Sequence, residues 1–220
     1  MKIKTKFNKD LLAGLKRKAT NKVVLLYSGG VDSTAAGVVL KEEGYEIYPL
    51  FVDYSQSAGK AELFLARKGS KKAGFRPIKV IKTKLMLDLS KSKLLGKSAI
   101  DDQDAWVPGR NTLFMIIAGI YAEQIDADGI SIGYMLDDNF VFGDNDYFHH
   151  KAIEETLSKS FLRPLKVFMP IVNKTKKELI AVLDKRNLTE LTVSCWNAQV
   201  VKGQIKICHK CANCLEREKL

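Results

Sequence analysis

The residues best suited to chemistry near the start of the chain form the segment Ser-Gly-Gly-Val-Asp-Ser-Thr at residues 28–34. Gly29 and Gly30 can adopt backbone angles that other residues avoid, so several N–H groups can point at one anion. The polar side chains are one carboxylate and three hydroxyls, on Asp32, Ser28, Ser33 and Thr34. The carboxylate could hold the turn or a magnesium ion. These features predict a phosphate-binding loop at the start of a helix, with a plain glycine turn capped by serine as the alternative.

A second group of reactive side chains, the four cysteines, lies between residue 195 and the C-terminus. Their spacing is C-x12-C-x2-C-x2-C, and each C-x2-C pair can place two thiolates on one metal ion. Four thiolates make the closed tetrahedral site of structural zinc, so we predict zinc ligation by Cys195, Cys208, Cys211 and Cys214. An iron–sulfur cluster is the alternative. Because a closed site offers a substrate no open position, its predicted role is to stabilise the tail, and the adjacent His209 is superfluous to it.

The composition indicates an ordinary globular protein, with 46% hydrophobic and 28% charged residues among 220. The longest apolar run, residues 113–125, is too short to span a membrane and contains Gly119 and Glu123. The first residues lack the apolar stretch of a secretory signal, so we predict a cytoplasmic protein. The net charge of +11 favours polyanionic partners such as nucleotides or nucleic acid, although a lysine-rich solvated surface would also explain it.

Short apolar runs alternate with helical patterns, which predicts an α/β fold built on a doubly wound parallel sheet. We expect strands at residues 23–27, 46–52, 77–81 and 129–133, and helices at 33–43, 60–73, 111–125, 147–159 and 175–185. The polar stretch between the third strand and about residue 105 is predicted to hold a short helix or a mobile lid. Ligands of such sheets bind at the carboxyl ends of the strands, which places Tyr27, Asp53 and Tyr134 near the site.

The chain divides by composition into three predicted parts: a basic segment at residues 1–20, a main domain at 21–190 and a metal-binding tail at 191–220. The basic segment is expected to contain a helix at residues 9–18. It could contact phosphate, but a solvated surface is the default interpretation.

Residues 28–34 contain neither the Gly-Lys-Ser/Thr of a Walker A loop nor the GxGxxG dinucleotide fingerprint. They resemble instead the loop of the N-type ATP pyrophosphatases, the PP-loop superfamily. Its members form a substrate adenylate, release pyrophosphate, and let a nitrogen or sulfur nucleophile displace AMP. The resemblance implies a Rossmann-like fold of the adenine nucleotide alpha hydrolase type, with ATP and Mg²⁺ as cofactors. The implied nucleotide contacts are Tyr27, Ser28, Gly29, Gly30, Val31, Asp32, Ser33, Thr34, Val52, Asp53 and Tyr54.

Three further segments are similar to the 7-cyano-7-deazaguanine synthases. They are Val107-Pro108-Gly109-Arg110-Asn111, Ser194-Cys195-Trp196-Asn197 with the later cysteines, and Thr175-Lys176-Lys177-Glu178. The resemblance implies a place in queuosine biosynthesis: 7-carboxy-7-deazaguanine is adenylated and captured by ammonium, and the amide oxygen is then adenylated and lost to leave the nitrile. The implied catalytic residues are Asp32, Ser33, Arg110 and Lys176. The two cationic side chains, with magnesium, would offset charge that builds on the α-phosphate.

The substrate side departs from this family's pattern. After the second strand, Asp53, Tyr54 and Gln56 match the family, but its Gly, Arg and His are replaced, and Glu62 fits a later Glu only with one inserted residue. Past the fourth strand the family's Arg becomes Asp146, a charge reversal. The predicted substrate contacts are Gln56, Asn111, Gly133, Asp138, Phe142 and Asp144. These departures favour a related deazapurine acid as an alternative substrate.

Three aromatic and imidazole features past the fourth strand allow two interpretations each. Phe140 and Phe142 could stack on a base or simply pack. The pair His149-His150 invites a metal or acid–base role. Because adjacent helical side chains point in different directions, a place on the helix surface or at its cap is the prediction.

Two other functions remain open. A PP-loop enzyme that thiolates or amidates a tRNA base would use the basic charge, although commitment of every cysteine to a metal argues against thiolation. A nucleotide-binding module without catalysis is the third hypothesis, and the intact loop argues against it. A homodimer is implied by the family resemblance alone, and no membrane partner is expected.

Overall fold

A five-stranded parallel sheet forms the centre of the computed structural model, which describes residues 18–136 and 142–220. The strand order is β3-β2-β1-β4-β5, so the first strand lies in the middle. The strands are β1 Lys22–Leu26, β2 Glu46–Asp53, β3 Lys79–Lys82, β4 Gly129–Ser131 and β5 Lys166–Phe168. Val24 pairs with Tyr48 on one side and with Ile130 on the other. The predicted Rossmann-like parallel sheet is therefore confirmed.

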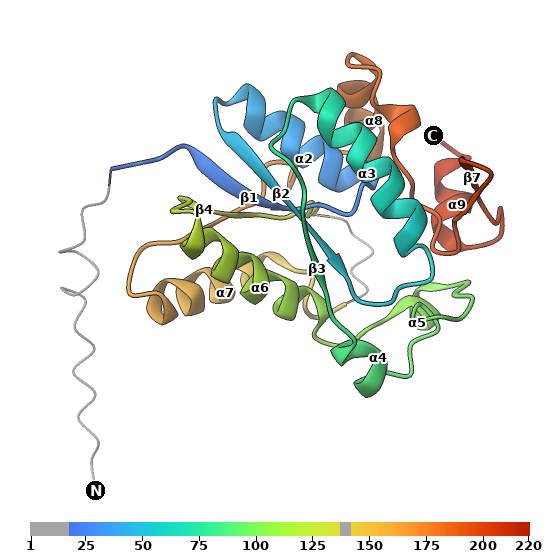
Figure 1. Cartoon of the computed structure of the whole chain (residues 1–220), viewed down its shortest axis with the longest axis horizontal. Coiled ribbons are helices and arrows are strands. Elements are labelled where there is room, and N and C mark those ends of the chain that lie inside the picture. Colours follow the sequence, from blue (N-terminus) through green and yellow to red (C-terminus); the bar gives the residue numbers. More distant parts are fainter. Residues whose placement is uncertain (1–17, 137–141) are drawn as a thin grey trace, which may run out of the picture.

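Helices cover both faces of the sheet, as Figure 1 shows. One face carries α2 Val31–Glu42, α3 Gly59–Ala73 and α8 Lys176–Asp184, and the other carries α6 Arg110–Gln124 and α7 Tyr147–Ser160. These bounds lie within two residues of the predicted helices. Helix α3 ends at Gly74, whose φ of 68° is the left-handed conformation that glycine adopts without strain.

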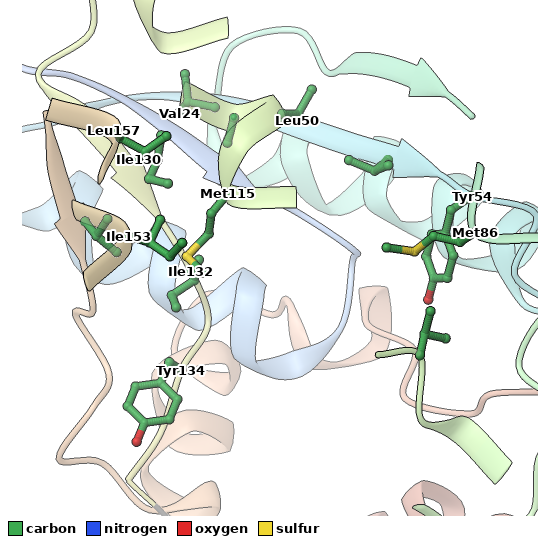
Figure 2. Close-up of a cluster of buried hydrophobic side chains, with 14 of the residues drawn as sticks. Val24, Leu50, Tyr54, Met86, Met115, Ile130, Ile132, Tyr134, Ile153 and Leu157 are labelled. Atoms are coloured by element: carbon green, nitrogen blue, oxygen red, sulfur yellow. The ribbon is translucent and has the colours of Figure 1, made fainter. Parts of the chain in front are cut away.

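The two faces of β1 bury different cores, because successive strand residues point to opposite sides of a sheet. Val24 packs in a cluster with Met115 of α6 and Leu157 of α7, part of which is drawn in Figure 2. Leu25 belongs to the cluster on the other face, with Leu179 of α8. Burial on both faces explains why the strand reads as a continuous apolar run.

The polar stretch after β3 is a packed segment with two short helices, α4 Leu85–Leu89 and α5 Asp102–Ala105. The predicted short helix is thus confirmed. Between the two helices, Leu94, Leu95 and Ala99 are buried in the main core. The N–H of Ser57 donates to the Leu94 carbonyl at 2.9 Å, which ties the segment to the end of β2. This packing places the segment against the main core.

The remaining short elements were absent from the sequence prediction. Strand β5 has three residues, too few to show a pattern. The tail adds the 3-10 helix η1 Thr189–Leu191, the antiparallel pair β6 Gln199–Val201 and β7 Gln204–Lys206, and α9 Ala212–Arg217. In the tail, Cys195 and Cys211 pack against Ala61 and Leu65 of α3. The tail is therefore fixed to one end of a sheet-covering helix.

Two expectations fall largely or wholly outside the described residues. The predicted helix at residues 9–18 and the residues Asp138 and Phe140 belong to this group. Within residues 18–136 and 142–220, none of the helices has the length and apolar character needed to cross a membrane.

Candidate functional site

A cavity of about 390 Å³ opens at the carboxyl ends of β1, β2 and β4. The four residues predicted to be catalytic all line it: Asp32, Ser33, Arg110 and Lys176. So do these predicted nucleotide and substrate contacts: Tyr27, Ser28, Gly30, Val31, Val52, Tyr54, Gln56, Asn111, Gly133 and Phe142. Gly29, Thr34, Asp53 and Asp144 are not part of its lining, and Asp138 lies outside the described residues. Sequence positions far apart are thus brought to one space.

Hydrogen bonds within the phosphate loop, defined here as residues 28–34, hold its backbone at the start of α2. The Oγ of Ser33 and the Oγ1 of Thr34 donate to the Gly30 carbonyl at 3.3 and 2.7 Å. The N–H of Gly30 donates to the Ser28 Oγ at 3.2 Å. Val193 of the tail donates its N–H to the Gly29 carbonyl at 3.1 Å. The loop therefore presents its amides at a helix N-terminus, where an anion binds favourably.

Two glycines let other elements approach this loop closely. Gly29 has a φ of +79°, and a Cβ there would lie 3.0 Å from the Cβ of Ala66 on α3. Gly133 follows β4, and a Cβ there would lie 2.7 Å from the amide nitrogen of Ser33. A side chain at Gly133 would consequently block the first turn of α2. The close approach of Gly133 to α2 is a structural reason for a glycine here, in addition to its predicted contact with substrate.

Thr34 and Tyr27 support the loop from beneath it. The Thr34 side chain is buried, and its hydroxyl donates to the Gly30 carbonyl. This hydroxyl, which is predicted to contact ATP, therefore has its hydrogen used within the loop. Tyr27 is also buried, and this burial raises the pKa of its phenol to about 12. Tyr27 is therefore a neutral group under physiological conditions.

Lys176 lies beside the loop because α8 begins there. Thr175 caps α8, its hydroxyl accepting from the Glu178 N–H at 3.3 Å, while the Glu178 carboxylate accepts from the Thr175 N–H at 2.7 Å. This reciprocal capping box fixes the first turn of the helix. Lys176 then donates from its Nζ to the Oδ1 and Oδ2 of Asp32 at 2.6 and 2.8 Å. Two residues predicted to be catalytic thus form one ion pair at the phosphate loop.

Arg110 begins α6, after Gly109 at the helix cap. Its guanidinium Nη1 lies 3.4 Å from the hydroxyl of Tyr54, a long hydrogen bond. Burial raises the pKa of Tyr54, which packs edge-on against Phe114 with ring centroids 5.1 Å apart. Arg110 therefore reaches the cavity, and no carboxylate among residues 18–136 and 142–220 forms an ion pair with it.

A buried amide and a carboxylate form a second pair on the cavity wall. The Gln56 Nε2 donates to the Glu62 Oε2 at 2.8 Å, and the Gln56 Oε1 accepts from the Tyr54 N–H at 2.9 Å. Desolvation raises the pKa of Glu62, and the Gln56 hydrogen bond and the charge of Arg110 oppose that effect. In the sequence Glu62 fits the family pattern only with one inserted residue. Its place in the cavity could not be foreseen from spacing alone.

The segment after β4, which we call the post-β4 wall (residues 142–150), is held by its acidic residues. The Asp144 Oδ2 accepts from the Asn111 N–H at 2.9 Å, so it holds the start of α6. Asp146 caps α7, its Oδ1 accepting from the His149 N–H at 2.9 Å. The charge reversal at Asp146 therefore has a local structural role. Phe142 and Asn145 are the side chains of this wall that line the cavity before α7.

The prediction of a surface or cap position is wrong for His150. Its side chain is fully buried, lines the cavity and meets the ring of Tyr134 edge-on at 4.7 Å. Neither ring nitrogen has a hydrogen-bond partner among residues 18–136 and 142–220. Burial lowers the pKa of His150 to about 4, so its imidazole is neutral. Its neighbour His149 instead hydrogen-bonds the Thr112 hydroxyl at 2.9 Å.

The four cysteine sulfurs of the tail lie within 4.8 Å of one another. Tetrahedral zinc with metal–sulfur bonds of about 2.3 Å requires sulfur–sulfur edges of roughly 3.8 Å. The Cys208–Cys214 and Cys211–Cys214 separations are 3.9 and 3.6 Å, which fits this geometry. Backbone N–H groups of Asn197 and Cys208 point at the Cys195 sulfur from 3.4 and 3.3 Å. The cluster can therefore hold a metal ion.

The tail also forms part of the cavity wall, which the sequence did not predict. Ser194, Trp196, Asn213 and Glu216 line the cavity together with Val193. Trp196 directly follows one cysteine of the cluster, and Asn213 lies between two others. Folding of the tail around the cluster thus shapes the cavity as well as the surface.

Comparison with known proteins identifies close relatives. The family described as "Queuosine biosynthesis protein QueC" matches residues 22–220. A 7-cyano-7-deazaguanine synthase of Saccharophagus degradans is 33% identical over 220 residues, covering 91% of this chain and 93% of the relative. Synthases of the same name from Campylobacter jejuni and Methanocaldococcus jannaschii are 32% and 29% identical, each covering 90% of this chain and at least 92% of the relative.

Solved structures share the fold at lower identity. A 4-thiouridine synthetase in complex with RNA and ATP is 20% identical with a TM-score of 0.53, covering 90% of this chain and 49% of that one. The U34-tRNA thiolase NcsA of Methanococcus maripaludis is 17% identical with a TM-score of 0.54, covering 82% and 60%. At these identities the likeness concerns architecture alone. The family match over nearly the whole described chain, by contrast, shows that this protein belongs to the QueC family of queuosine biosynthesis proteins.

Proposed function

We propose that this chain is an ATP-dependent ligase that converts 7-carboxy-7-deazaguanine, or a related deazapurine acid, to its amide and nitrile. ATP would adenylate the carboxylate, ammonium would supply the nitrogen, and AMP and pyrophosphate would be released. The observation that carries the proposal is the shared cavity, which the phosphate loop, Arg110 and Lys176 all line. The name of the curated relatives, 7-cyano-7-deazaguanine synthase, supports the choice of substrate class.

The reaction needs an anion site, and the phosphate loop supplies one. The amides at the N-terminus of α2 would bind the pyrophosphate end of ATP. Ser28 and Ser33, whose hydroxyls lie 3.2 Å apart, would add donors at the cavity surface. Lys176, held at the loop by Asp32, would offset the charge that develops on the phosphates. The loop is organised by its own hydrogen bonds before any ligand binds, so little reorganisation is needed.

A magnesium ion that arrives with ATP would be held by Asp32, because a carboxylate oxygen is the kind of ligand that Mg²⁺ prefers. When bound, the ion would neutralise phosphate charge during adenylation.

The flat heterocycle of the substrate would bind between aromatic side chains. Phe114, Phe142 and Trp196 all line the cavity, and each comes from a different part of the chain. Arg110 would pair with the substrate carboxylate before adenylation and with the α-phosphate afterwards, since a guanidinium suits either anion. Asn111 and Asn145 offer amide groups for the polar edge of the ring.

The metal of the tail would be zinc with a structural role. All four cysteines of the chain are in the cluster, which leaves none to carry sulfur in a tRNA thiolation. Metal analysis by mass spectrometry would distinguish one zinc per chain from an iron–sulfur cluster.

The proposal is tested by ATP/pyrophosphate exchange with purified protein and a series of carboxylic acids. Exchange should depend on 7-carboxy-7-deazaguanine and should produce amide and nitrile when ammonium is added. Exchange with a different deazapurine acid alone would move the substrate and keep the reaction class. Absence of exchange with every acid, together with salt-sensitive tRNA binding, would favour the tRNA-modifying alternative.

A further inference from the structure

Glu62 lies one helical turn from the phosphate loop without belonging to it. It is in the first turn of α3, four residues before Ala66. Residues four apart share a helix face, with their Cβ atoms about 6 Å from each other. Ala66 packs directly against Gly29 of the phosphate loop. The Glu62 carboxylate therefore lines the same cavity as the phosphate loop.

The carboxylate is oriented by Gln56. Because the Gln56 Oε1 is occupied by the Tyr54 N–H, the Nε2 must face Glu62 and the Val52 carbonyl. One oxygen of Glu62, Oε2, is thus held at 2.8 Å. The other oxygen, Oε1, accepts no hydrogen bond within the described part of the chain. It is available to a hydrogen-bond donor in the cavity.

The charged groups around Glu62 leave its negative charge only partly compensated. Arg110 on α6 attracts the carboxylate, Asp53 at the end of β2 repels it, and Tyr54 beside them is neutral. Glu62 makes no ion pair with Arg110 in the described residues. Desolvation raises its pKa, which makes it a stronger base than an exposed glutamate. The Glu62 carboxylate is oriented and poorly solvated, and no cationic side chain of the described residues is paired with it. Such a carboxylate is suited to bind a small cation that carries N–H donors.

We propose that Glu62 binds the ammonium ion and accepts its proton when ammonia attacks the acyl adenylate. The inference rests on the proposed function. Ammonium gives one proton to the Glu62 carboxylate and becomes ammonia, whose lone pair forms the new C–N bond at the acyl carbon. The C–O bond to AMP breaks, and AMP leaves with that electron pair. A second N–H proton passes to water as the amide forms, and Glu62 later releases its own proton to water.

The test separates nitrogen capture from adenylation by comparing wild type with Glu62→Gln. The variant should retain 7-carboxy-7-deazaguanine-dependent ATP/pyrophosphate exchange within about threefold, because adenylation does not use the ammonium site. Amide formation from ammonium should fall by about 100-fold, the lower range for loss of a general base. Hydroxylamine, which is uncharged near neutral pH, should be captured at nearly the wild-type rate. Conversion of supplied amide to nitrile should also persist, since that step consumes no ammonium.

Three results would overturn the assignment. The first is a KM for ammonium in Glu62→Gln equal to that of the wild type. The second is an equal loss of capture rate with hydroxylamine and with ammonium. The third is a loss of ATP/pyrophosphate exchange in a variant that still unfolds at the wild-type temperature. Glu43→Gln, which changes an exposed carboxylate just past α2, controls for net charge. Failure of the proposed function would show differently, as absence of acid-dependent exchange in the wild-type protein itself.

Discussion

The phosphate loop and the post-β4 wall border the same cavity, but they are held in different ways. The loop is held largely by its own side chains, because the hydroxyls of Ser33 and Thr34 donate to the Gly30 carbonyl, and Val193 of the tail adds one backbone hydrogen bond. The post-β4 wall depends on contacts with other elements, such as Asp144 with Asn111 at 2.9 Å. The wall also keeps a buried imidazole, His150, without a hydrogen-bond partner in the described residues.

This difference indicates a division of labour. In the proposed function the phosphate loop binds the pyrophosphate end of ATP, a task that needs a rigid backbone held by nearby residues. Selection among substrates needs side chains that can be substituted while the phosphate loop keeps its structure. Buried polar atoms without partners destabilise the free protein by roughly 1–3 kcal/mol each, and His150 carries this cost in the lining of the cavity. Substitutions in the two regions should therefore affect activity and stability differently.

Asp32→Ala should nearly abolish ATP/pyrophosphate exchange, by about 100- to 1,000-fold, because it removes the partner of Lys176 at the phosphate loop. The free energy of unfolding should change little, since the pair is partly exposed to solvent. Exchange kinetics and urea unfolding on the same preparation measure both quantities. Full exchange activity in the variant would mean that the loop is not the nucleotide site.

Cys211→Ser should lower the metal content below one ion per chain and destabilise the tail by roughly 4 kcal/mol or more, as loss of a structural metal does. Because Val193 bonds to Gly29 and Trp196 lines the cavity, activity should fall with the metal. Metal analysis and urea unfolding, with and without a chelator, give the measurement. A metal-free variant with wild-type stability would show that the cluster is not a structural site.

His150→Leu should flatten the dependence of stability on pH. The pKa of His150 is lowered from 6.5 to about 4 in the folded state, so the unfolded chain binds the proton first as the pH falls. The contribution of His150 to the free energy of unfolding is therefore fully present above pH 6.5. It decreases toward pH 4, by up to about 3 kcal/mol. Urea unfolding between pH 4 and 7.5 measures the slope.

The difference between wild type and His150→Leu isolates this group from other acid-sensitive sites, including the cysteine cluster. His209→Gln is the matched control, because that side chain is 67% exposed. A wild-type slope in His150→Leu would show that the buried imidazole does not titrate as its surroundings imply.

Asp146→Ala and Thr175→Ala should each cost about 1 kcal/mol of stability, because each removes a helix N-cap. Their effects on activity should differ. Only Thr175→Ala loosens the turn that carries Lys176, so exchange should fall several-fold in that variant and stay near wild type in Asp146→Ala. An equal loss of exchange in both variants would contradict the distinction between the phosphate loop and the post-β4 wall.

Features set by neighbouring residues could be read from the sequence. The strand, turn and helix around residues 28–34 follow from an apolar run and two glycines, and the cysteine spacing predicts a four-thiolate cluster. The cluster's geometry agrees with that prediction. In each case the residues that determine the structure are close together in the chain.

Features that depend on packing could not be read in this way. Burial of His150 depends on how α7 approaches Tyr134, and adjacent histidines give no indication of which one turns inward. The orientation of Glu62 depends on Gln56, whose amide is fixed by a backbone N–H at Tyr54. Strand β5 is too short to carry a pattern and forms because β4 offers it an edge. Long-range contacts decide these features, and a single sequence does not show them.

In the proposed reaction, AMP is transferred to a substrate oxygen in the cavity. This transfer can be measured by supplying 7-carboxy-7-deazaguanine with both carboxylate oxygens labelled with ¹⁸O and recording the mass of the AMP formed. We expect one ¹⁸O atom in each AMP, the first AMP released on amide formation and the second on nitrile formation. Unlabelled AMP formed alongside labelled phosphate or labelled water would contradict it.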